Sequence, residues 1–343
     1  MDVALFDYEL PPELIAQQPA DRRPNSRMLL LPRAGGAPCD GVFAHLPEHL
    51  RRGDCLVLND TRVIPARLIG RRPTGGQAEV LLLRELEPGR WRALVRPGAR
   101  MRPGATAVFG DGELTVEVEQ MGSGGERTIR LRHEGALEAV LDRLGRMPLP
   151  PYIRRPEPEE ADRERYQTVY ARRAGAAAAP TAGLHFDEAM LARVQDKGVE
   201  VVFVTLHVGL GTFQPVSVER VEEHEMHEEW CEVGPEVAAA IGRCRAAGGR
   251  VIAVGTTCVR TLESRAADGG TVAPGAGMTK LFITPGYRFR VVDGLLTNFH
   301  LPRSTLLMMV SAFAGRERVL AAYAHAATHG YRFYSYGDCM LIV

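Results

Sequence analysis

The sequence predicts an α/β protein whose main domain has a largely parallel sheet and is interrupted by a small antiparallel β-barrel. After about residue 135, helix-like segments alternate with apolar runs, a pattern typical of sheets with parallel strands. Between about residues 62 and 133, short strand-like runs and Gly- and Pro-containing turns replace that pattern, which favours a barrel. Strand-like runs also precede this segment. We therefore expect a main domain of residues 1–61 and 146–343, with an inserted barrel domain of residues 62–145.

Six short runs of β-forming residues account for the predicted barrel. They cover residues 63–72, 78–86, 91–96, 106–109, 114–120 and 128–133. Turns such as Pro-Thr-Gly-Gly at 73–76 and Gly-Asp-Gly at 110–112 separate them. Regular spacing of this kind indicates antiparallel neighbours.

The main domain is predicted from apolar runs and from helix boundary signals. The apolar runs cover residues 27–31, 55–58, 199–207, 250–254, 281–284 and 339–343, and the helix-like segments cover 187–197, 235–247, 305–313 and 315–329. Asp187 suits an N-cap and Pro235 a first helical turn. Gly198 and Gly248 suit the residues that follow helix ends. Ser304 could cap the apolar helix after it.

Composition limits the kinds of partner that the chain can bind. It has 42 Lys and Arg and 42 Asp and Glu among 343 residues, so its net charge is zero and any RNA site needs a local basic patch. Two stretches rich in Arg meet that need, and the alternative is Arg scattered over a barrel surface. From them we select five candidate phosphate contacts: Arg67, Arg71, Arg92, Arg96 and Arg100.

The six cysteines are scattered and contain no C-x-x-C pair, so we expect reduced thiols in a cytoplasmic protein. The first residues, Met-Asp-Val-Ala-Leu, carry no cationic start of a signal peptide. The longest apolar run, 306–314, is far shorter than the roughly 20 residues that cross a bilayer. A soluble protein without a membrane partner is expected.

Polar residues follow the predicted strand 55–58 in an unusually dense group. Asn59, Asp60, Thr61 and Arg62 place an amide, a carboxylate, a hydroxyl and a guanidinium in one turn. Ligands of α/β proteins usually bind where parallel strands end. The alternative is an Asx-type turn in which Asp60 caps backbone amides.

Two loops combine glycines with a single imidazole. The first, 180–186, contributes Thr181, Gly183 and His185, and the second, 206–213, contributes His207, Gly209, Gly211 and Thr212. Glycines allow backbone amides to approach a ligand closely. A lone histidine is more often structural than catalytic, so both interpretations stay open for His185 and His207.

Two further polar segments lie at the start of a predicted helix or directly before one. Thr256, Thr257 and Arg260 lie at the start of a predicted helix, which suits an anion such as a carboxylate or phosphate, although Thr could also simply cap the helix. Asn298 and His300 lie in a loop before the helix 305–313.

The segment 224–229, His-Glu-Met-His-Glu-Glu, invites a metal interpretation but lacks the H-E-x-x-H spacing. Six acids between residues 219 and 229 favour a solvated acidic surface, and we predict no metal site.

Taken together and in this order, these segments resemble the S-adenosylmethionine:tRNA ribosyltransferase-isomerase family of queuosine synthesis. Besides the two Gly/His loops, the resemblance is carried by residues 6–11, 14–17, 58–63, 149–153, 166–170, 255–257, 282–287, 298–302 and 334–338. These stretches span nearly the whole chain.

The resemblance implies a specific reaction. The ribosyl part of S-adenosylmethionine is transferred to 7-aminomethyl-7-deazaguanine at the tRNA wobble position and isomerised. Adenine and methionine leave, and the product is epoxyqueuosine-tRNA. S-adenosylmethionine is then a consumed co-substrate and no cofactor is bound. A monomer that acts on precursor tRNA is expected, with the five barrel arginines as tRNA contacts.

Proton transfers in this reaction need groups that titrate near neutrality. We therefore name Asp60, His185, His207 and His300 as catalytic candidates, without assigning acid or base. The other polar and glycine residues of the loops are substrate-binding candidates: Asn59, Thr61, Arg62, Thr181, Gly183, Gly209, Gly211, Thr212, Thr256, Thr257, Arg260 and Asn298.

Two other classes of protein remain open. A non-catalytic tRNA-binding protein would need the basic barrel but not the polar loops. A transferase that acts on a free metabolite would leave the arginines without a role. Adenine release that depends on precursor tRNA would distinguish both from the enzyme.

Overall fold

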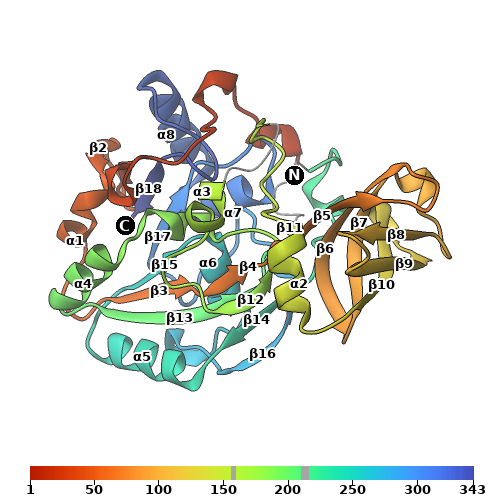
Figure 1. Ribbon diagram of the computed structural model, residues 1–343. Coiled ribbons are helices and arrows are strands. Elements are labelled where there is room, and N and C mark those ends of the chain that lie inside the picture. The colour runs from red at the N-terminus through yellow and green to blue at the C-terminus, as the bar shows by residue number, and fades with distance from the viewer. Residues whose placement is uncertain (156–159, 210–215) are drawn as a thin grey trace.

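The computed structural model describes residues 1–155, 160–209 and 216–343. A nine-stranded sheet with helices and a six-stranded barrel make up two distinct parts, and the barrel projects from one end of the molecule (Figure 1). The predicted fold class is confirmed.

The four central strands of the large sheet run parallel. Their order is β13 (Glu200–Leu206), β3 (Cys55–Asn59), β15 (Val251–Val254) and β17 (Gly294–Asn298). All but parts of β13 are buried, as expected for strands covered on both faces. Their carboxyl ends share one edge, so the loops that follow them converge there.

The margins of the sheet add antiparallel pairs to this parallel centre. On one side lie β14 (Glu229–Val233) and β16 (Gly275–Thr279). On the other, β18 (Cys339–Ile342) is antiparallel to β17, β1 (Arg27–Leu31) is parallel to β18, and β2 (Cys39–Val42) closes the edge. The sheet is therefore mixed, with parallel pairs among its four central strands and between β18 and β1.

The predicted strand at 281–284 is wrong. Leu281, Phe282 and Ile283 pack against the main core without joining a ladder. The edge strand in this region is β16 instead, whose Gly-Ala-Gly-Met-Thr sequence has little β-propensity. Sequence reasoning mistook apolar burial for strand pairing.

The long helices begin and end close to the predicted boundaries. They are α4 (Glu188–Asp196), α5 (Pro235–Ala246), α6 (Thr256–Ser264), α7 (Thr305–Ala314) and α8 (Arg316–Thr328). The Met190 amide donates to Asp187 at 2.7 Å and the Leu307 amide to Ser304 at 3.2 Å, so both predicted caps are confirmed. Shorter helices are α1 (Leu46–His49), α2 (Leu137–Leu144) and α3 (Glu160–Arg165).

The barrel closes without a free edge. Its strands are β5 (Arg67–Arg71), β6 (Gln77–Glu87), β7 (Arg90–Arg96), β8 (Thr106–Phe109), β9 (Leu114–Met121) and β10 (Glu126–His133). Their order is β5-β6-β7-β10-β9-β8, and β8 pairs back to β5. Alternate side chains, such as Trp91, Ala93 and Val95, fill a core separate from that of the main sheet. β11 (Gly145–Arg146) pairs with β5.

A short parallel ribbon joins the two parts. β4 (Thr61–Val63) leaves the end of β3 and pairs with β12 (Arg173–Ala176) before the chain enters the barrel. β3 ends at Asn59 and β4 begins at Thr61, and Figure 1 shows β4 at the junction between sheet and barrel. The exact extent of the inserted domain, 62–145, stays a prediction. No helix in the described part of the chain is both long and apolar enough to cross a membrane.

Candidate active site

Two concave regions meet near the carboxyl ends of the parallel strands. A cleft of about 1090 Å³ separates barrel from main domain, and a small pocket of about 50 Å³ lies beside β15 and β17. The segment after β13 divides them, because His207 and Gly209 line the cleft whereas Val208 lines the pocket. Leu306 lines both, so the two spaces adjoin.

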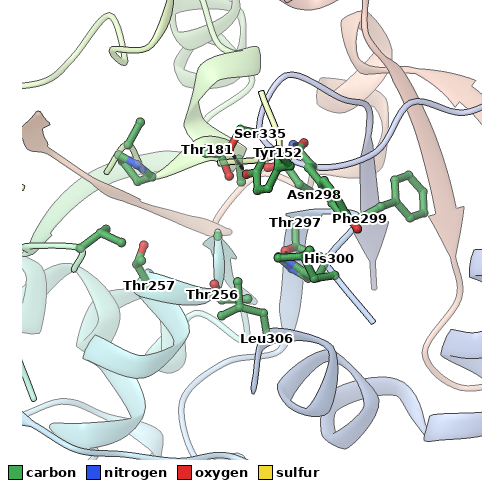
Figure 2. A pocket seen from close by; sticks show the side chains of 17 residues that line it. Tyr152, Thr181, Thr256, Thr257, Thr297, Asn298, Phe299, His300, Leu306 and Ser335 are labelled. Atoms are coloured by element: carbon green, nitrogen blue, oxygen red, sulfur yellow. Dashed lines mark hydrogen bonds between the residues drawn. The ribbon is translucent and has the colours of Figure 1, made fainter. Parts of the chain in front are cut away.

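Polar side chains from several elements surround the small pocket (Figure 2). Those predicted from sequence are Thr181, Thr256, Thr257, Asn298 and His300, and those not predicted include Tyr152, Thr297, Tyr334 and Ser335. Tyr334 has a φ of +69°, a strained backbone that clusters at functional sites. Tyr152, Tyr334 and Ser335 belong to family-like stretches 149–153 and 334–338, which carried the resemblance without indicating a role for any residue.

Asn298 is held rigidly at the end of β17. Its Nδ2 donates to Nε2 of His185 at 3.3 Å and to the carbonyl oxygens of Tyr334 and Asp338 at 3.2 and 3.4 Å. Its Oδ1 has no hydrogen-bond partner among the described residues, although the residue is buried and lines the pocket.

His185 is buried behind Asn298 and does not line either space in the described structure. Burial, reinforced by Arg332 and Arg23, lowers its pKa to about 3. Its Nε2 accepts from Asn298, and its ring packs 5.4 Å from that of Phe43. These contacts favour a positioning role over the predicted proton transfer.

His300 lines the small pocket but its ring is already engaged. Nε2 lies 2.7 Å from the hydroxyl of Thr297, and burial lowers the pKa of His300 to about 3. Its backbone amide donates to the Tyr323 hydroxyl at 3.0 Å and its carbonyl accepts from Tyr8. The side chain is neutral at physiological pH.

His207 faces the large cleft from the end of β13. Its Nδ1 lies 2.8 Å from the Thr61 hydroxyl, and its ring stacks on Trp230 with centroids 5.0 Å apart. Gly175 lies against the other ring edge, where an added Cβ would come within 2.9 Å of Nε2. Burial chiefly, and then Arg173, lower the pKa of His207 below 6.5, whereas Asp60 opposes the shift. A neutral imidazole can accept a proton.

The turn after β3 is largely occupied by structural bonds. Asn59 Oδ1 accepts from the amides of Thr61 and Leu206, both at 3.1 Å, and its Nδ2 donates to the Leu206 carbonyl at 3.0 Å. Asp60 accepts from Thr205 at 2.7 Å and pairs with Arg172 at 3.1 Å. Thus Asn59, and not the expected Asp60, caps the backbone amides of this turn, whereas Asp60 is close enough to His207 to oppose the lowering of its pKa. Arg62 is half-buried in β4.

Arg260 is committed to a buried ion pair at the wall of the cleft. It pairs with Glu229, and its Nε donates to the Leu281 carbonyl at 3.2 Å. The other carboxylate oxygen of Glu229 accepts the Gly209 amide at 2.8 Å. Glu229 therefore departs from the solvated acidic surface expected for segment 224–229, although its neighbours Glu225, His227 and Glu228 are exposed.

The start of α6 lacks an ordinary cap. Its N-cap is Gly255, with a φ of +87° and no side-chain hydrogen bond, so the alternative in which a Thr side chain caps this helix is wrong. In the other predicted loop, an added Cβ on Gly183 would come within 2.0 Å of the Tyr170 hydroxyl. Gly183 thus permits close packing. Gly211 and Thr212 lie outside the described residues.

The barrel arginines are partly neutralised by neighbouring strands. Arg67 pairs with Glu79 at 2.9 Å and Arg92 with Glu126 at 3.3 Å. Both glutamates are distant in sequence from their arginines and become neighbours only through strand pairing, so the sequence alone did not indicate these ion pairs. Arg71, Arg96 and Arg100 are exposed, and none of the ion pairs in the described residues involves them. Arg92 also lines the cleft.

The described residues contain one cluster with metal-ligand chemistry, away from both spaces. Atoms of Asp40, His325 and His329 lie within 4.8 Å of one another. Asp40 already accepts from Tyr331 at 2.6 Å and lies 3.4 Å from Arg27, a cation that opposes metal binding. The prediction that no metal is needed stays a prediction.

The fold and the site together define a class of protein. It is an α/β protein with an inserted barrel, in which polar loops border a large cleft at the ends of the parallel strands. The model of the family described as "Queuosine biosynthesis protein" matches residues 3–342. The chain belongs to this family.

Known relatives cover the full length. A protein of Anaeromyxobacter sp. named S-adenosylmethionine:tRNA ribosyltransferase-isomerase is 58% identical over 100% of this chain and 99% of its own. One of the same name from Symbiobacterium thermophilum is 55% identical over 100% of both. The crystal structure of S-adenosylmethionine tRNA ribosyltransferase from Thermotoga maritima, 37% identical, covers 99% of this chain and 100% of its own with a TM-score of 0.57.

Proposed function

We propose that this chain is an S-adenosylmethionine:tRNA ribosyltransferase-isomerase. It transfers the ribosyl part of S-adenosylmethionine to 7-aminomethyl-7-deazaguanine at the tRNA wobble position and isomerises it to epoxyqueuosine. Full-length identity of 55–58% to relatives with this enzyme name supports the proposal. The enzyme consumes S-adenosylmethionine, releases adenine and methionine, and acts as a cytoplasmic monomer without a bound cofactor.

One observation carries the proposal beyond the family name. The cleft has a barrel wall that includes Arg92, and a main-domain wall that includes Trp230 and neutral His207. A cation and an aromatic ring suit a nucleotide, because phosphates attract Arg and bases stack on aromatic rings. At about 1090 Å³ the cleft can enclose an extruded base together with a nucleoside.

His207 is the preferred proton acceptor among the candidates. It faces the cleft, its Nδ1 is held by Thr61, and its other nitrogen lies against Gly175, where no side chain blocks it. The reaction needs removal of a proton from the carbon beside the sulfonium and deprotonation of the attacking amine. Asp60 supports His207 electrostatically, whereas His185 and His300 have pKa values too low for proton exchange at neutral pH.

The tRNA lies along the barrel strand β7 and the cleft. Arg96 and Arg100, exposed and outside the ion pairs of the described residues, are the strongest candidates for phosphate contacts. Arg71 lies on β5, which β6 separates from β7. Arg92 and Arg67 would have to exchange their glutamate partners for phosphate.

The test is product analysis. Purified protein is incubated with S-adenosylmethionine and wobble-position precursor tRNA, and the tRNA is digested to nucleosides for mass spectrometry. We expect a nucleoside with an added epoxycyclopentanediol group. A methylated nucleoside, or an unchanged precursor with fully folded protein, would refute the proposal.

A further inference from the structure

Asn298 presents an unpaired carbonyl oxygen to the small pocket. Its Nδ2 contacts three acceptors, two of them backbone carbonyls, so a flipped amide would place Oδ1 against oxygens. Neutral His185 completes this arrangement by accepting on Nε2. The residue is 2% exposed. A buried acceptor without a donor is costly, so a ligand that carries N–H or O–H groups would stabilise it.

The first turn of α6 offers the opposite chemistry to the same pocket. Its Gly255 cap leaves the first amides without a side-chain acceptor, and the turn contains no acidic residue. Thr256 and Thr257 are more than nine-tenths buried and line the pocket, and Thr257 Oγ1 has no hydrogen-bond partner in the described structure. Free amides at a helix N-terminus attract anions.

Oδ1 of Asn298, which has no donor among the described residues, and the first turn of α6, which attracts an anion, belong to neighbouring strand ends. β15 and β17 are parallel neighbours with Val254 opposite Leu296, so Thr256 and Asn298 each follow two residues later. The strand spacing of about 4.8 Å holds up to Val254 and Leu296; beyond it Thr256 belongs to α6, and both Thr256 and Asn298 line the same small pocket. A single small group with one positive and one negative end can therefore contact both, and Figure 2 shows these side chains around one space.

The size and charge of the pocket decide what that group is. A volume of about 50 Å³ holds roughly three to five water-sized groups. No Lys, Arg, Asp or Glu is among its lining residues in the described structure, and His300 is neutral. A phosphate would enter with an uncompensated charge, whereas an α-amino acid zwitterion carries none.

We propose that this pocket holds the amino-acid end of S-adenosylmethionine, with the carboxylate at the first turn of α6 and the ammonium on Oδ1 of Asn298. The inference rests on the proposed function. Leu306, which lines both spaces, then marks the passage through which the sulfonium reaches the cleft. His185 acts as a positioning residue that fixes the Asn298 amide.

The experiment compares two probes that differ only at this end. S-adenosylhomocysteine has the amino-acid group, and 5′-methylthioadenosine lacks it. Their affinities are measured by calorimetry without tRNA for wild type and for Thr257→Val, which removes the hydroxyl at constant volume. Thr328→Val, which loses a hydroxyl at an exposed position of α8, is the matched control. Asn298→Ala is the second variant.

We expect wild type to prefer S-adenosylhomocysteine at least tenfold. Thr257→Val should lower the affinity for S-adenosylhomocysteine by about three- to tenfold, the usual effect of one lost hydrogen bond, and leave the affinity for 5′-methylthioadenosine unchanged. Asn298→Ala should also reduce the preference. A wild-type preference that both variants retain would overturn the pocket assignment while the proposed function stands. Equal affinity of the wild-type protein for the two probes would also overturn the pocket assignment alone. If neither probe bound to the wild-type protein, the proposed function would be overturned as well.

Discussion

Replacing Glu229 with Gln removes one charge from the buried pair with Arg260 at nearly constant volume. The side chains of both residues are 6% exposed, so solvent screens their interaction poorly. A Gln oxygen can still accept the Gly209 amide, which Glu229 accepts at 2.8 Å. The change therefore isolates the loss of the countercharge.

Removing one partner of a buried pair typically costs about 3–5 kcal/mol. Because the Gly209 bond can persist, we expect the lower end of this range. Glu232→Gln on the same strand is the control, since Glu232 pairs with Arg173 at a surface where the arginine side chain is 48% exposed. Such exposed pairs contribute about 0–1 kcal/mol.

The assay is urea unfolding followed by circular dichroism and by tryptophan fluorescence, with the double variant Glu229→Gln/Arg260→Gln included. The double variant should be more stable than the sum of the two single changes predicts, because neither charge is then left unpaired. If Glu229→Gln costs no more than Glu232→Gln, the pair does not stabilise this wall of the cleft.

Three further outcomes are expected. His207→Gln should lower turnover by about a hundredfold or more with tRNA affinity retained. Because the pKa of His207 is lowered, turnover of the wild-type protein should fall only below pH 6.5. A decline that begins above pH 7 would exclude His207 as the base. Burial lowers the pKa of His185 and His300 from 6.5 to about 3. The contribution of each residue to the free energy of unfolding is therefore full above pH 6.5 and declines by about 1.4 kcal/mol per pH unit as the pH falls toward 3. In urea titrations, His300→Gln should flatten this decline. Weaker tRNA binding and a shallower salt dependence are expected in filter-binding assays for the triple variant Arg92→Ala, Arg96→Ala and Arg100→Ala but not for Arg132→Ala, and equal effects would move the RNA site elsewhere.

Local signals in the sequence predicted much of the fold. Six short β-forming runs separated by Gly- and Pro-containing turns identified the barrel. The sequence likewise predicted that Asp187 caps the helix after it, and the Met190 amide donates to Asp187 in the structure. β17 and β16 were missed because neither follows a distinctive pattern: one is short and fully buried, the other is a glycine-containing edge.

The site was predictable at the level of loops but not of roles. Sequence position indicated that Thr257 and His207 follow strands, whereas Asn298 was placed only in a loop before a helix. The structure brings Asn298 and Thr257 to one pocket and His207 to the cleft. Burial depth decided the rest: His185 is shielded and Glu229 is paired, and neither fact has a local signature. Neutralisation of Arg92 by Glu126 depends on strand pairing across more than thirty residues of sequence.

Adenine release from S-adenosylmethionine tests the enzymatic proposal most directly. Its rate is measured with precursor tRNA, with the same tRNA carrying guanine at the wobble position, and without RNA. We predict release with the precursor tRNA only, in equal amounts with methionine. Release at the same rate without precursor tRNA, or formation of S-adenosylhomocysteine in place of adenine and methionine, would contradict ribosyl transfer.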